Sequence, residues 1–140
     1  MKPLGSRNIG RTRESGSALV EVALVLPIIL VLAMGMLDFG RAFHTKGLLD
    51  QAAREGCRLA VVTAPDVALV QSRVASILAT GGVTAGAITV TGPDASRMIT
   101  VTVNATFTFA TPGVFAFVGA SFGNTLAMAG QATMRFESGS

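Results

Sequence analysis

The sequence has few of the residues on which catalysis and metal binding usually depend. His44 is its only histidine, so one chain cannot form a Ser-His-Asp triad or a zinc site built from several histidines. Cys57 is its only cysteine, which excludes a disulfide within one chain but leaves a bridge between two chains open. Tryptophan and tyrosine are absent, so neither can stack on nucleic-acid bases. We therefore expect a protein that is not an enzyme and that uses no metal or cofactor.

The charged residues are unevenly distributed along the chain. The chain carries 11 basic and 8 acidic residues, a net charge of +3. Residues 1–16 hold four of the basic residues and one of the acids, which leaves seven of each sign in residues 17–140. The basic character therefore belongs to the N-terminal segment alone. A neutral remainder gives no support for nucleic-acid binding, and nothing in the spacing indicates a small-molecule substrate.

A long apolar stretch, residues 17–37, follows the basic segment. Glu21 is the only charged residue among the 23 that separate Glu14 from Asp38. As a helix the stretch would be about 31 Å long, which matches the hydrocarbon core of a bilayer. It predicts a transmembrane helix, and the basic flank before it favours a cytoplasmic N-terminus. A removable secretory signal is the alternative, but the stretch is longer than a usual signal core and no small-x-small cleavage site follows it.

The remaining sequence predicts a small mixed head. Residues 38–62 lack proline and carry helical charge pairs, so we expect one helix to continue through them as a stalk. A second helix is predicted over 66–80, and strands over 87–91, 98–110 and 126–136, while residues 114–122 have no clear pattern. The expected fold class is α+β, with a long transmembrane helix, a short helix and an antiparallel sheet of about three strands. The expected division is a leader (1–16), a membrane span (17–37), a stalk (38–62) and a head (63–140).

Three sequence blocks together resemble a known family. They read GSALVEVALVLPIIL, LDFGRAF and AAREGCRLA, and they lie between residues 16 and 60. A basic leader, a glycine and a carboxylate five residues further on are typical of type IV prepilins. The combination is similar to the TadE/TadF-like minor pseudopilins of the Tad (Flp, tight adherence) pilus system. The family motif matches at the following residues: Asp38, Phe39, Gly40, Arg41, Ala53, Arg54, Glu55 and Gly56.

The resemblance implies a structural role in pilus assembly. A prepilin peptidase would cut between Gly16 and Ser17 and leave Glu21 as the fifth residue of the mature chain. The implied partners are other pilins or pseudopilins, the peptidase and the inner-membrane platform of the pilus. The implied location is the bacterial inner membrane, with a single span and a periplasmic head. Whether the chain enters the fibre, sits at its tip or only primes assembly stays open, as does the choice between a TadE-like and a TadF-like role.

Elementary electrostatics gives Glu21 a function in this setting. An acid within a membrane helix is expensive unless it is paired, and the free amine of a processed Ser17 is positive at neutral pH. Glu21 of one subunit would pair with that amine on a neighbour and set the register between helices. Positioning near the lipid headgroups is the alternative role for Glu21. Pro27 removes one helical hydrogen bond and predicts a kink that would help helices pack or leave the bilayer.

A second function stays open on the sequence alone. A single-pass anchor that presents a binding or adhesion domain, and is never cleaved or assembled, would carry the same apolar stretch. Cleavage after Gly16 distinguishes the two, because a plain anchor has no reason to lose its leader.

Overall fold

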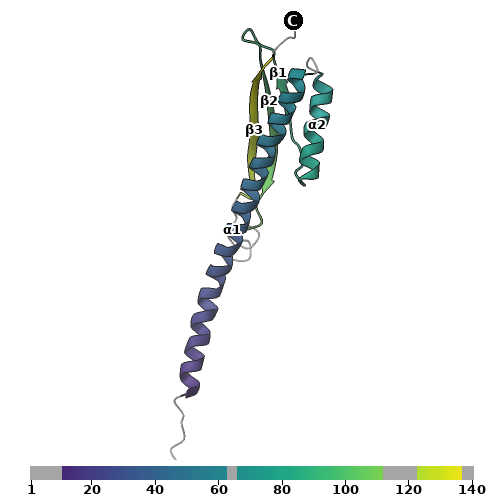
Figure 1. The fold of residues 1–140 in the computed structure, drawn as a ribbon. Coiled ribbons are helices and arrows are strands. Elements are labelled where there is room, and N and C mark those ends of the chain that lie inside the picture. The colour runs from purple at the N-terminus through teal and green to yellow at the C-terminus, as the bar shows by residue number, and fades with distance from the viewer. Residues whose placement is uncertain (1–10, 63–65, 112–122, 137–140) are drawn as a thin grey trace, which may run out of the picture.

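The computed structural model describes residues 11–62, 66–111 and 123–136, which form two helices and one sheet. Helix α1 spans Arg11–Val62 and helix α2 spans Val67–Thr80. The strands are β1 (Ile88–Thr91), β2 (Met98–Thr108) and β3 (Thr125–Arg135). The α+β prediction is confirmed. Residues 114–122, which have no clear sequence pattern, lie outside the described ranges. As Figure 1 shows, α1 extends far beyond the head formed by the other elements.

Helix α1 is continuous from Arg11 to Val62 and has two distinct segments. It begins inside the predicted leader, and Pro27 lies within it without ending it. We call residues 16–37 the anchor segment and residues 38–62 the packed segment. The anchor segment has no buried residue, whereas the packed segment lies against the head. The sequence predicted this continuity, because neither segment contains a run that favours a turn.

Helix α2 begins where its sequence predicts. The carboxylate of Asp66 accepts hydrogen bonds from the backbone N–H groups of Ala68 and Leu69, each at 3.1 Å. These bonds satisfy two of the four N–H groups that a helix start leaves without helical partners. The helix then runs back along α1 and buries one side of its surface, at Val70, Val74 and Leu78.

The sheet is antiparallel in the order β1-β2-β3, with β2 in the centre. Burial alternates along the central strand as predicted. Its apolar residues from Ile99 to Phe107 are buried, and the threonines between them are not. Both helices therefore cover one face of the sheet, and the other face presents uncharged polar side chains. On that outer face the hydroxyl groups of Thr100 and Thr133 lie 2.9 Å apart and share a hydrogen bond across β2 and β3.

The core lies between the packed segment, α2 and the sheet. Small residues on α1 and β3 let these layers approach closely. A Cβ atom on Gly56 would lie 2.8 Å from Cγ2 of Val74, and one on Gly130 would lie 2.4 Å from the backbone of Leu49. Residues 38–62 are thus built into the head as well as extending the helix. The fully enclosed side chains of the core are Leu49, Ala52, Ala53, Cys57, Ala60, Val70, Val74, Leu78, Ile99, Val101 and Val103.

Candidate functional site

The anchor segment exposes an apolar surface that no described residue covers. Its most hydrophobic 18-residue window has a mean hydropathy of 2.6 and is not buried at all. Leu19 and Leu24 are each about 70% exposed, at 71% and 70% respectively. This is the one helix in the described ranges that is long and apolar enough to cross a membrane. Such a surface is typical of a helix surrounded by lipid or by other apolar helices, so the anchor segment is the one candidate membrane span in the described residues.

Glu21 lies on this exposed helix without a partner in the described part of the chain. Its side chain is exposed, as are Gly16 and Ser17 one turn before it. The predicted processing position is itself helical, and nothing lies within 4 Å of a Cβ atom built on Gly16. Glu21 precedes Asp38, the first residue of the packed segment, by 17 residues of α1, which corresponds to about 25 Å along a helix. Any group that pairs with Glu21 must therefore come from outside the described residues.

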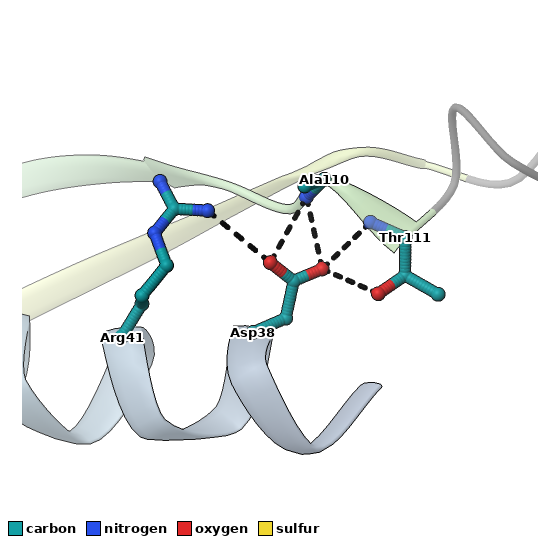
Figure 2. Close-up of polar contacts among 4 residues, drawn as sticks. All are labelled: Asp38, Arg41, Ala110 and Thr111. Carbon is teal, nitrogen blue, oxygen red and sulfur yellow. Dashed lines mark hydrogen bonds and ion pairs between the residues drawn. The ribbon is translucent and has the colours of Figure 1, made fainter. Parts of the chain in front are cut away.

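A cluster of polar contacts joins α1 to the sheet at the first residue after the anchor segment. Asp38 accepts hydrogen bonds from the backbone N–H of Ala110 at 2.9 Å and from that of Thr111 at 2.7 Å. The hydroxyl of Thr111 donates a further bond at 2.5 Å, and Nη1 of Arg41 lies 3.2 Å from the other carboxylate oxygen. Figure 2 shows all four residues, which we call the clasp. The clasp fixes the chain just past the end of β2 to the point where α1 enters the head.

The clasp holds Asp38 as a carboxylate although its side chain is only 4% exposed. Hydrogen bonds from Thr111, first from its hydroxyl and then from its backbone, lower the pKa of Asp38 from 3.8 to about 2. Burial acts in the opposite direction, while the N–H of Ala110 and the charge of Arg41 add to the lowering of the pKa. Several donors aimed at one carboxylate favour its charged form, so the Asp38 side chain stays ionised at neutral pH.

Arg41 connects the clasp to the end of the core nearest the anchor segment. Its guanidinium carbon lies 5.4 Å from the centre of the Phe107 ring, a distance that suits a cation–π contact. The Phe107 ring in turn meets Phe109 edge to face, with 5.0 Å between ring centres. Phe39, by contrast, is 64% exposed, and Gly40 is exposed beside it. The first block of the family motif therefore contains two residues that tie the helix to the head and two that face outward.

The second block of the motif is divided in the same way. Ala53 and Gly56 are buried under the sheet and α2, while Arg54 is exposed. Glu55 accepts hydrogen bonds from the Arg58 guanidinium at 2.8 and 2.9 Å, and Arg73 of α2 lies 3.7 Å away. The Arg58 side chain lowers the pKa of Glu55. The motif thus combines close packing with an ion pair that reaches the second helix.

Cys57 is enclosed and does not offer its thiol to a second chain. Its Sγ donates to the backbone carbonyl of Ala132 at 3.0 Å, and burial raises the pKa of the thiol. A higher pKa means less of the reactive thiolate. Within the described ranges no three His, Cys, Asp or Glu side chains come together in a group that would hold a metal ion.

Sequence reasoning identified Asp38 and Arg41 as motif residues but missed their partners. Thr111 follows the predicted strand 98–110, and its role as a donor could not be predicted, because a hydrogen bond across 73 residues leaves no mark in local spacing. A lone acid placed directly after an apolar stretch was the available signal. Such an acid has to find donors or water once the helix packs.

Comparison with known proteins finds a family match for the part of the chain that contains most of these features. Residues 16–58 match the family of TadE-like proteins. The matched range begins at Gly16 and includes Glu21, both motif blocks and the α1 side of the clasp. Neither the curated proteins nor the solved structures include a match to this chain. The resemblance to the TadE-like family is therefore confirmed over residues 16–58, and the rest of the head is described by the structure alone.

Proposed function

From the match of residues 16–58 to the TadE-like family, we propose that this Tad pilus-associated chain is a pseudopilin-like structural component. One observation carries the proposal. Helix α1 is continuous, and its anchor segment is apolar and uncovered while its packed segment is built into a folded head. This is the arrangement of a subunit that holds a head outside a membrane and offers its helix to other helices. It does not depend on a catalytic group.

Processing after Gly16 is the second part of the proposal. The residue lies where the basic segment ends and the apolar surface begins, and its surroundings in the described chain are open. A prepilin peptidase would remove residues 1–16 on the cytoplasmic side, and the head would lie in the periplasm. Residues 17–37 would then be the membrane span of the mature subunit.

Glu21 is the assembly residue in this mechanism. After processing, the Ser17 amine of a neighbouring subunit is a cation at the right depth to pair with the Glu21 carboxylate. An unpaired carboxylate in lipid would instead take up a proton, so pairing favours helices in one register. The pair sets which register is adopted more than it adds stability. Pro27, on the same uncovered helix, would loosen the backbone hydrogen bonding where helices pack or leave the bilayer.

The test begins with the mass and N-terminal residue of the chain isolated from native membranes. We expect the chain to start at Ser17. A chain that starts at Met1 would instead indicate a permanent anchor that presents a binding or adhesion head, and the processing proposal would be wrong.

Assembly is tested by Glu21→Ala, with Val22→Ala as the matched control. Val22 is the next residue on the same uncovered helix and is 58% exposed. We expect Glu21→Ala to be processed normally but to disappear from the fraction that cross-links to other pilus subunits, and Val22→Ala to remain in it. Equal cross-linking of the two variants would contradict the role of Glu21.

A further inference from the structure

A polar groove opens in the part of the head nearest the anchor segment. It has a volume of about 460 Å³. Its walls come from α1, from the loop after α2 and from the lower end of β2. The groove residues on which the argument depends are Arg41, His44, Thr84, Thr106, Phe107 and Thr108. Arg41 also belongs to the clasp, but neither the clasp nor the proposed Glu21 pairing assigns a ligand to this space.

The depth of the groove relative to the membrane suits a lipid headgroup. Arg41 and His44 follow the proposed span by four and seven residues, which corresponds to about 6 and 10 Å along a helix. The headgroup layer is about 5–8 Å thick on each side of the hydrocarbon core. The lower rim of the groove therefore lies within that layer. Phe43, 75% exposed on the same stretch of α1, is an apolar side chain placed at the same boundary.

The charges around the groove favour an anion. Arg41 and His44 line it, and the side chain of Arg41 is 60% exposed although Nη1 contacts Asp38. Lys46 is nearby on α1, but it is occupied by Asp50 at 2.7 Å and by the carbonyl of Ala129 at 2.6 Å. No acid other than Asp38 belongs to residues 38–48, 81–86 or 105–111. A guanidinium group with free N–H donors is well suited to bind phosphate oxygens.

The strand edge adds backbone donors to the same space. Strand β1 begins at Ile88, which pairs with Val103, so β2 continues beyond the start of its antiparallel neighbour. The last backbone bonds on that side join Asn104 to Gly86 and Ala87. Alternate residues of a strand turn their N–H and C=O groups to the same edge, so those of Thr106 and Thr108 face the groove side. Within the described residues these groups have no partner on that edge.

We propose that this groove binds the phosphate of a membrane phospholipid headgroup. Arg41 supplies the positive charge, His44 supplies a ring N–H donor, and the N–H groups of Thr106 and Thr108 supply directed hydrogen bonds. The carbonyl groups on the same edge accept from the hydroxyl or ammonium part of the headgroup. The inference rests on the proposed membrane span, because only an inserted anchor brings the groove to headgroup depth. A bound lipid would orient the head at the membrane surface.

The test uses the full chain purified in detergent and a matched pair of variants. Thr84→Glu places a negative charge on the groove wall, and Thr89→Glu places one on an exposed position of β1 outside it. Native mass spectrometry measures how much phosphatidylglycerol each form retains. We expect the wild-type chain and Thr89→Glu to retain one lipid, and Thr84→Glu to retain at least fivefold less. Equal retention by the two variants would overturn the proposal.

Two further arms separate the proposal from its alternatives. Glycerol phosphate and inorganic phosphate are added as competitors, and we expect neither to displace the lipid at equal concentration. Displacement by either one would mean that the groove binds free phosphate, and the lipid assignment would be wrong. Flotation with vesicles checks the span independently. A wild-type chain that does not float would contradict membrane insertion and the headgroup site with it, whereas flotation without lipid retention would contradict the headgroup site alone.

Discussion

The two segments of helix α1 share one backbone but meet entirely different surroundings. In the packed segment Leu49 has no exposed surface, whereas in the anchor segment Leu24 is 70% exposed. The packed segment gains its apolar contacts within its own chain, so it contributes to the stability of the head. The anchor segment gains them only from lipid or from other chains. The contrast shows that one continuous helix can stabilise a folded head at one end and leave an apolar surface for lipid or other chains at the other.

Substitution of one leucine in each segment tests this contrast most strongly. Leu49→Ala removes a fully enclosed side chain and should lower the free energy of unfolding of the head by about 2–5 kcal/mol. Leu24→Ala removes the same atoms from an uncovered surface and should leave that free energy unchanged. Thermal unfolding in detergent, followed by circular dichroism, measures both. A comparable loss from Leu24→Ala would mean that the anchor segment packs on the head after all.

The clasp lies at the boundary between the two segments, and its effect should depend on pH. The folded pKa of Asp38 is about 2, below its ordinary value of 3.8. A lowered pKa means that the folded state holds the proton more weakly than the unfolded state does. The stabilisation by Asp38 is therefore complete above about pH 4 and is lost as the pH falls through 2.

Asp38→Asn should remove most of this pH dependence and lower the unfolding temperature at pH 7. The amide would turn an NH₂ group toward the N–H donors of Ala110 or Thr111, which need an acceptor. Thr111→Val keeps the carboxylate and removes only the hydroxyl donor, so it should lower the unfolding temperature by less than Asp38→Asn does. Unfolding temperatures measured between pH 2 and 7 check both variants. Some pH dependence should remain in Asp38→Asn, because the pKa of Glu55 is also lowered in the folded chain. An unchanged profile would show that the clasp does not stabilise the head.

Much of the fold followed from local sequence patterns. Alternation along β2 predicted which residues face the core, and the lack of breakers after Asp38 predicted that α1 continues. Asp66 directly after Pro65 predicted the start of α2. The local patterns did not give the contacts between distant residues. The hydrogen bonds from Thr111 to Asp38 and the fit of Gly130 against Leu49 depend on how the sheet lies on the helix, which no spacing records. The groove was missed for the same reason, since its walls come from three separated segments.

The smallest expected effect concerns whether burial in the packed segment protects the Cys57 thiol from chemical modification. Iodoacetamide should modify the native thiol slowly at pH 8, because the group is enclosed and its pKa is raised. The matched control is Gly47→Cys in a Cys57→Ala background. Gly47 lies on the same helix with open space around it, so a thiol there should be modified many times faster. Both thiols should react alike in denaturant. Fast modification of native Cys57 would show that the packed segment opens readily, and a disulfide between two chains would then be within reach of this residue.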